Sequence, residues 1–232
     1  MMWFVTLALV AGALAVDHRA GWQGLLAHPV FASVLVGSIL GEMSAALAVG
    51  LPIELVYLSI IPMRGGISTD QVAAGVVGPG TAALLVRHAG GADPVFIYAI
   101  GVFLGLVAGE AGARITAPFF GLHNRFLGGI EFPQDLERSS VARRLSVIHC
   151  GSLVFIFVVE GLAVLLLATA AYYAGDMFTR IADGALVRGS VWWNGLIPAI
   201  GAASVVHLFW QHRFRIALAG CAALVVIVSW LV

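Results

Sequence analysis

The chain has 232 residues, of which 61% are hydrophobic and only 10% are charged, and its formal net charge is zero. A soluble domain usually has about 25% charged residues, so this composition disfavours a soluble enzyme, and it shows no basic surface for nucleic acid. The apolar runs are continuous rather than alternating, which favours helices over a membrane β-barrel. The sequence therefore predicts an all-α polytopic membrane protein in a lipid bilayer, with about six or more transmembrane helices of roughly 20 apolar residues each.

The apolar segments lie at about 2–16, 28–50, 51–63, 70–90, 94–110, 145–172, 191–210 and 214–232. The first segment ends in small residues, like a signal-peptide cleavage site, but it lacks a positive n-region and is read as a membrane segment. Segments 51–63 and 70–90 are short or interrupted, the second by Gly75, Gly78, Pro79 and Gly80. Interruptions at membrane depth are typical of transporter substrate sites. They predict broken or re-entrant helical hairpins here, with a pair of kinked helices as the alternative.

Glycines recur every four residues from Gly101 to Gly109, and Gly37 and Gly41 repeat this spacing. Small residues at this spacing let helices approach closely, so these positions predict helix packing rather than chemistry.

The polar region at about 111–144 is predicted to be a cytoplasmic loop within one membrane-embedded domain that covers residues 1–232. The prediction follows from the positive-inside rule and from five arginines: Arg114, Arg125, Arg138, Arg143 and Arg144. The next span then runs outward, the 173–190 connection is external, and the C-terminus is external.

The sequence assigns no catalytic residue, metal ligand or cofactor to this chain. It contains no P-loop, no nucleophile elbow, no HExxH and no dinucleotide fingerprint. Cys150 and Cys221 lie in apolar runs without metal-type spacing, so both are expected to be buried packing thiols. A phosphoryl group, if the activity uses one, would be carried by another subunit.

Ionisable residues in apolar segments are functional candidates because they are costly in a membrane. They are Glu42, Glu54, Arg64, Asp70, Arg87, Glu110, His149 and Glu160. Glu42 and Glu110 lie near segment ends, and Arg87 is placed at an interface. Glu54 is isolated, so its carboxylate needs hydrogen-bond donors, neutralisation or water. Sugar hydroxyls would supply donors; the alternative is a structural carboxylate bonded to backbone amides or to Arg64.

His149 and Glu160 are eleven residues apart, close to three helical turns, so both are able to face one side of a helix. The alternative for His149 is a core histidine with one satisfied ring nitrogen.

Two stretches resemble the mannose/sorbose-family IIC subunits of the sugar phosphotransferase system. The first is HPVFASVLVGSILGEMSAALAVGLPIELVYLSIIPMRGGISTDQVAAGVV, in which Glu42, Glu54 and Asp70 occupy the family's acidic positions. The second is RRLSVIHCGSLVFIF, which matches a family segment at Ser146, His149, Ser152 and Leu153. The two stretches cover about a quarter of the chain.

The resemblance implies a multi-pass sugar permease subunit of the bacterial cytoplasmic (inner) membrane. It implies a homologous IID membrane partner, a trimer of heterodimers, and cytoplasmic IIA and IIB proteins that relay phosphate from phosphoenolpyruvate. IIB would phosphorylate a sugar that the membrane subunits bind and move by an elevator-like displacement. Together with the residues above, it predicts a substrate site made of Glu54, Asp70, Arg64 and His149.

The chain departs from the family pattern at Pro62, Arg64 and Thr69, where the family commonly has asparagine, glycine and proline. Arg64 needs a counter-charge, which Glu54, Asp70 or an acidic sugar would supply, unless the side chain extends to an interface. These departures leave two other functions open. One is a scaffold or regulator that no longer transports; the other is a secondary transporter with Glu54 or Asp70 as a proton or cation site.

Overall fold

The computed structural model describes residues 1–19, 25–57, 69–88, 92–130, 138–182, 184, 186–192, 195, 199 and 203, without the side chains of 138–140. Every regular element within these residues is helical, which confirms the all-α prediction. The elements are α1 (Met2–Arg19), the 3-10 helix η1 (Leu25–Ala27), α2 (Pro29–Leu40), α3 (Met43–Tyr57), α4 (Gln71–His88), α5 (Pro94–Gly128) and α6 (Arg138–Ile181).

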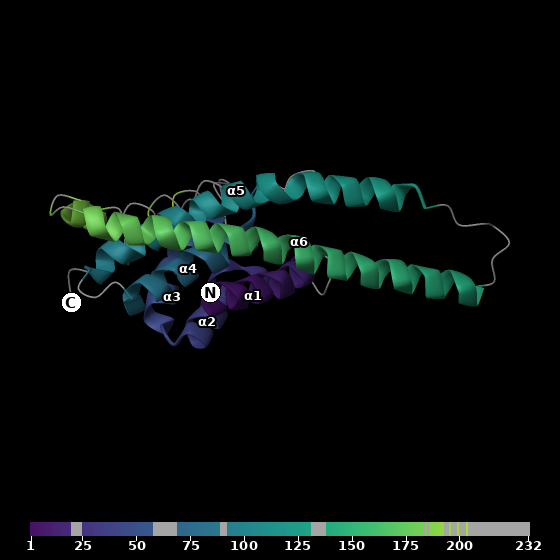
Figure 1. The fold of residues 1–232 in the computed structure, drawn as a ribbon, viewed down its shortest axis with the longest axis horizontal. Helices are drawn as coiled ribbons and strands as arrows, with labels where there is room; N and C mark the ends of the chain where they lie inside the picture. The colour runs from purple at the N-terminus through teal and green to yellow at the C-terminus, as the bar shows by residue number, and fades with distance from the viewer. Residues whose placement is uncertain are drawn as a thin grey trace, which may run out of the picture.

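Helix α4 is the centre of the bundle. Helices α2, α3, α5 and α6 pack around it, α1 touches it, and α1 also lies along α6 (Figure 1). Every residue from Val72 to Leu85 is buried. A helix that is small and apolar on all sides is expected to be enclosed in this way.

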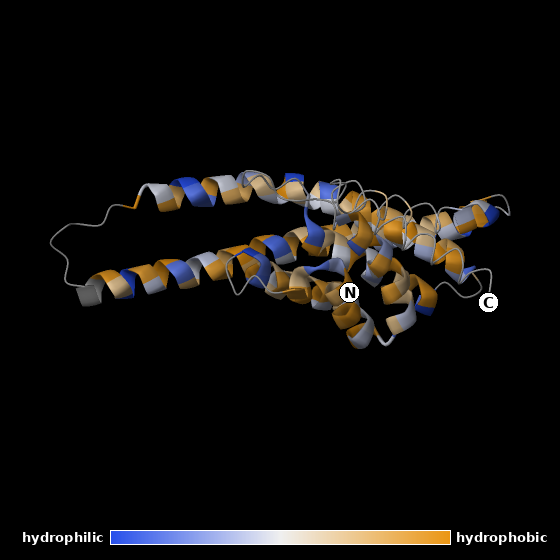
Figure 2. Ribbon diagram, turned by 180° about the vertical axis from the view of Figure 1, so that it is seen from behind, coloured by the Kyte–Doolittle hydropathy of each residue, from blue (hydrophilic) through white to orange (hydrophobic). Residues whose placement is uncertain are grey.

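Helices α5 and α6 are much longer than a bilayer core is thick. Their 35 and 44 residues correspond to about 53 and 66 Å at 1.5 Å per residue, against roughly 30 Å of hydrocarbon. The C-terminal part of α5 and the N-terminal part of α6 extend beyond the bundle (Figure 1). Figure 2 shows hydrophilic residues recurring along these extensions, whereas hydrophobic residues dominate the bundle.

Three helices in the described part of the chain are long and apolar enough to cross a membrane: Met2–Arg19, Pro94–Gly128 and Val141–Ile181. Helices α2 and α3 are apolar but shorter. The predicted segment 214–232 and most of 191–210 lie outside the described residues, so the total number of spans remains a prediction.

Helices α2 and α3 form a tight hairpin. Pro29 occupies the first turn of α2, and Gly41 ends α2 with a φ of 74°. This left-handed conformation suits glycine, which has no Cβ to clash. Helix α2 has 12 residues, too few for a straight span, which fits a re-entrant hairpin; the described part of α3 has 15 residues. The turn lies at Gly41–Glu42, so the predicted boundary between segments 28–50 and 51–63 is wrong.

The predicted interruption of segment 70–90 is also wrong, because α4 is continuous with Pro79 inside it. Its glycines make room for neighbours instead. A Cβ at Gly75 would lie 2.8 Å from the Cα of Pro29, and one at Gly78 would lie 2.8 Å from the carbonyl oxygen of Gly101. A Cβ at Gly80 would meet Leu7 at 2.8 Å. Tertiary contacts with α1, α2 and α5 therefore outweigh the low helix propensity of these residues.

Two further predictions need correction. The polar region 111–144 is not one loop, since α5 continues to Gly128 and α6 begins at Arg138. Its polar residues mark helices that continue beyond the bundle. Cys150 is exposed rather than buried, and Cys221 lies outside the described residues.

The glycine spacing in α5 does serve packing, as predicted. A Cβ at Gly105 would lie 3.0 Å from the Cα of Gly78 and 3.1 Å from the carbonyl oxygen of Ala74. Gly101 packs equally closely, against Ala82 and Val49.

We expect Gly105→Ala and Gly121→Ala to have opposite effects, although both lie in α5. At Gly105 the methyl group meets rigid backbone, and overpacking of this kind costs about 1–3 kcal/mol. Nothing lies within 4 Å of a Cβ at Gly121, so alanine should stabilise the helix there by up to about 1 kcal/mol. Thermal unfolding of the purified variants in detergent measures both effects. Equal midpoints would contradict the packing described here.

Candidate functional site

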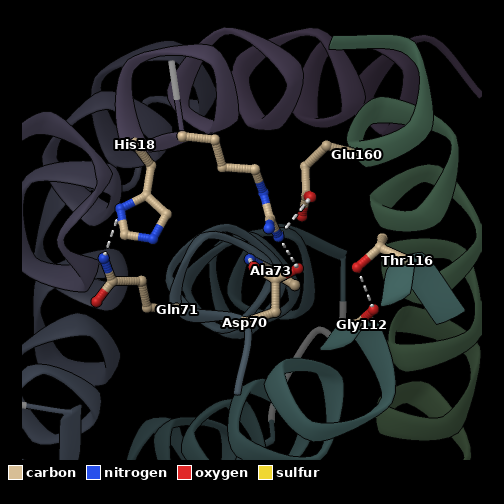
Figure 3. A network of polar contacts seen from close by, with 8 residues as sticks. His18, Asp70, Gln71, Ala73, Gly112, Thr116 and Glu160 are labelled. Atoms are coloured by element: carbon tan, nitrogen blue, oxygen red, sulfur yellow. Dashed lines mark hydrogen bonds and ion pairs between the residues drawn. The ribbon is translucent and has the colours of Figure 1, made fainter. Parts of the chain in front are cut away.

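A buried ionic cluster lies where α1, α4 and α6 meet. Nη2 of Arg19 is 3.5 Å from Oε2 of Glu160 and 3.8 Å from Oδ2 of Asp70. The side chains of Glu160, Asp70 and Arg19 are 0%, 2% and 15% exposed. Figure 3 shows the two carboxyl groups directed toward the same space from different helices.

Asp70 is held in place as the residue that precedes α4. Its Oδ1 accepts the backbone N–H of Ala73 at 3.0 Å, and its own backbone N–H donates to the carbonyl oxygen of Gly109 at 2.9 Å. An aspartate here satisfies a free helix N–H and interacts favourably with the positive end of the helix dipole. Gly112 packs against the Asp70 side chain at a distance that a Cβ would crowd. The glycines of α5 therefore position a candidate site residue as well as a helix.

The other contacts around the cluster keep α1 in register with α4. The guanidinium of Arg19 lies over the ring of Phe120, 4.2 Å from its centroid, a favourable cation–π arrangement. Nε2 of Gln71 donates to Nδ1 of His18 at 3.1 Å. Both contacts lie at the C-terminal end of α1, so they fix that end against α4 and α5.

Glu54 forms a second, separate site at the start of α2. Its Oε1 accepts Nδ1–H of His28 at 2.8 Å, and its Oε2 accepts the backbone N–H of Val30 at 3.1 Å. The Glu54 side chain remains 12% exposed. An ionised carboxylate offers about four acceptor positions, so these two bonds, the ones made within the described residues, leave room for further donors. The structural alternative predicted for Glu54, bonding to a backbone amide, is therefore present, and it does not exclude a ligand.

One residue near the end of α1 lies within electrostatic range of both sites. His18 lies within electrostatic range of both Asp70 and His28. Thr69, at the family's proline position, makes a side-chain hydrogen bond to Tyr57 of α3. The end of α3 and the start of α4 are thus joined directly.

The structure does not bring His149 into either site. His149 is exposed on α6, whereas Glu160 on the same helix is fully buried. The interpretation that both share one functional face therefore has no support, and neither does a core position for His149. The nearby Ser152 accepts Nε2–H of His123 at 3.0 Å while donating to the carbonyl oxygen of Ile148. This contact ties α6 to α5.

Three other candidates lie outside both carboxylate sites in the described structure. Glu110 pairs with Arg114 at 2.7 Å on the exposed surface of α5. Arg87 donates to the carbonyl oxygen of Leu40 at 2.9 Å and lies over the ring of Trp3. Glu42 is half-buried at the α2–α3 turn. Pro62 and Arg64 lie outside the described residues.

The sequence pattern predicts Glu54 and Asp70 as site residues but does not predict their partners. Arg19 follows an apolar segment, where an arginine usually marks a membrane interface, and it contacts Glu160 across 141 positions of sequence. The sequence pointed to His28 only through the histidine–proline pair that begins the first family-like stretch. Glu160 was noted as costly but received no role.

Comparison with known proteins is consistent with this fold. A solved structure titled "Structure of membrane protein" matches with a TM-score of 0.66 at 17% identity and covers 100% of this chain and 95% of its own. At this identity the match shows the fold alone. Among curated proteins, none matches the chain.

The family comparison covers almost the whole sequence. A model of the family described as "PTS system sorbose-specific iic component" matches residues 1–229. The match extends well beyond the two stretches that carry the resemblance and includes every residue of both carboxylate sites. The chain is an integral membrane protein that belongs to the sorbose-specific IIC family of the sugar phosphotransferase system.

Proposed function

We propose that this chain is the sugar-translocating IIC subunit of a mannose-type, phosphoenolpyruvate-dependent phosphotransferase system. It binds sugar and moves it to the cytoplasmic face of the bacterial inner membrane, where a separate IIB subunit phosphorylates it. The observation that carries this proposal is the family match over residues 1–229.

The geometry supports a sugar site at Glu54. The α2–α3 hairpin presents a partly exposed carboxylate that keeps unused acceptor positions within the described residues. Carboxylates accept hydrogen bonds from hydroxyl groups strongly, because one partner is charged. Asp70 and Arg64 are the other residues proposed to contact the sugar, Asp70 only after the start of α4 moves away from α1 and α6, and a contact from Arg64 would favour an acidic sugar. His149 is assigned to it only by the family resemblance.

Membrane partners are part of the proposal. Large apolar side chains are exposed on the extensions of α5 and α6: Phe119, Leu122, Phe126, Leu145 and Val147. These helices are too long to lie wholly in hydrocarbon, so some of this surface needs another protein to cover it. A IID-type subunit, in a trimer of heterodimers, is the proposed cover, and IIA and IIB are the cytoplasmic partners.

The proposed function predicts sugar uptake that depends on phosphoenolpyruvate and on co-expressed IIA, IIB and IID proteins. Uptake into cells or vesicles should persist when a protonophore collapses the proton gradient. Uptake that fails with the protonophore but proceeds without phosphoenolpyruvate would support the secondary transporter. Absence of uptake from a correctly assembled complex, over a panel of neutral and acidic sugars, would support the scaffold.

We expect Glu54→Gln to weaken sugar binding by about 10- to 100-fold, because a hydrogen bond to a charged group contributes roughly 1.5–3 kcal/mol. His28→Asn is the matched control, since it removes only the partner that holds Glu54 in place. Binding is measured on the purified complex, with unfolding midpoints recorded alongside. If both variants lose stability equally and bind sugar equally, Glu54 is a structural residue of the hairpin.

Because helix α5 is continuous, the topology prediction can be tested at its two ends. Its two ends must lie on opposite sides of the membrane if it crosses once. In a chain with both cysteines replaced by serine, Arg125→Cys should resist an impermeant thiol reagent added outside, and Ala92→Cys should react. The reverse pattern would place the arginine-rich helix ends outside, against the positive-inside rule.

A further inference from the structure

Three polar atoms in the buried cluster have no hydrogen-bond partner within the described residues. They are Nε of Arg19, Oδ2 of Asp70 and Oε1 of Glu160. Buried polar atoms are normally paired, and an unpaired buried carboxylate oxygen is expensive. The Asp70 and Glu160 carboxyl groups converge on the same atom, since Nη2 of Arg19 is 3.8 Å from Oδ2 of Asp70 and 3.5 Å from Oε2 of Glu160.

The charges of the cluster do not balance. Two carboxylates face one guanidinium. His18 supplies no positive charge while its Nδ1 accepts from Gln71. Within the described residues the cluster therefore carries one excess negative charge, which the surrounding apolar helices cannot stabilise.

In the described part of the chain, which does not include Arg64, the charged groups named here on the neighbouring elements are already engaged. On α5, Glu110 pairs with Arg114, and at the start of α2 His28 pairs with Glu54. Tyr57 on α3 has a side-chain hydrogen bond to Thr69. None of these supplies a positive charge to the cluster.

Whatever neutralises the excess charge must be very small. Each unpartnered oxygen exposes less than 1 Å² to solvent, so a sugar does not fit between the packed helices. Two carboxyl oxygens that face each other are satisfied together by one proton, which one group donates and the other accepts.

We propose that Asp70 and Glu160 share one proton, held in an O–H···O hydrogen bond that joins the start of α4 to the middle of α6. Arg19 then neutralises the one remaining negative charge. The proton acts as a removable link between these helices. Its loss leaves two carboxylates in contact and favours separation of α4 from α6.

The sign of the pH dependence follows directly. The packed state holds a proton that the two groups release when they reach water, so the packed state loses stability as pH rises. Glu160→Gln keeps a neutral donor of similar shape in place of the protonated group. It should retain stability at neutral pH and lose most of this pH dependence.

Infrared spectroscopy of the purified full-length chain detects the proton itself. The wild type at neutral pH should show a carboxylic-acid C=O band that shifts on transfer to D₂O. Glu160→Gln and Asp70→Asn should each lose that band, and the exposed control Glu110→Gln should keep it. Unfolding midpoints measured from mildly acidic to mildly alkaline pH should fall for the wild type and the control, and should change much less for Glu160→Gln.

The proposal is overturned if the wild type lacks the band, or if the band survives in Asp70→Asn and Glu160→Gln. If the wild type lacks the band, replacing choline by sodium or potassium at constant ionic strength tests for a metal cation instead. A higher unfolding midpoint in sodium or potassium would then mean that a metal cation, and not a proton, neutralises the cluster. Should either variant fail to fold, the wild type decides by itself. Its band and its midpoint must decline over the same pH interval. No readout involves sugar, so the result is independent of the proposed function.

Discussion

The arrangement of this bundle depends on one buried guanidinium. Arg19 comes from the end of the first helix and meets carboxylates at the start of α4 and in the middle of α6. In a low-dielectric interior each of these charges alone would cost several kcal/mol, and removing one leaves the others exposed to that cost. Three helices distant in sequence are therefore fixed at a single point. Apolar contacts between helices select one register much less strongly, because the lipid tails that compete for them are as apolar as leucine side chains.

Close backbone packing makes this meeting point possible. Gly75, Gly78 and Gly80 allow α2, α5 and α1 to approach α4 from different directions. On α5, Gly109 accepts the backbone N–H of Asp70, and Gly112 leaves space for its side chain. The same small residues that pack the helices thus place the carboxylate: a methyl group at Gly112 would press on the Asp70 side chain, and one at Gly109 would press on the backbone oxygen of Asp70. The close packing of the helices and the position of the buried carboxylate therefore depend on the same glycines.

The sequence predicted the helical membrane class, the close-packing glycines and two of the carboxylates, because each depends on local pattern. Hydropathy identified the apolar stretches but missed the turn at Gly41, since the flanking residues are apolar on both sides. The low helix propensity of Pro79 and its neighbouring glycines predicted an interruption. The helix is nevertheless continuous, because contacts from three neighbouring helices outweigh that local propensity. The polar region after residue 110 was read as a loop because charge alone does not distinguish a loop from a helix that leaves the membrane. The partners Arg19 and His28 were out of reach, because their contacts to Glu160 and Glu54 span 141 and 26 positions.

The two carboxylate sites differ in what a sugar would have to do to reach them. Glu54 keeps free acceptor positions and partial exposure, so a hydroxyl group can bind without disturbing the hairpin. Asp70 has one oxygen bonded to Ala73 and the other enclosed with Arg19 and Glu160, and its side chain is 2% exposed. A sugar can contact Asp70 only after the start of α4 moves away from α1 and α6. Occupation of Asp70 by substrate is therefore necessarily linked to helix displacement, whereas occupation of Glu54 is not. If both residues bind the same sugar, as the family resemblance implies, Glu54 receives it first and Asp70 binds it only in a rearranged bundle.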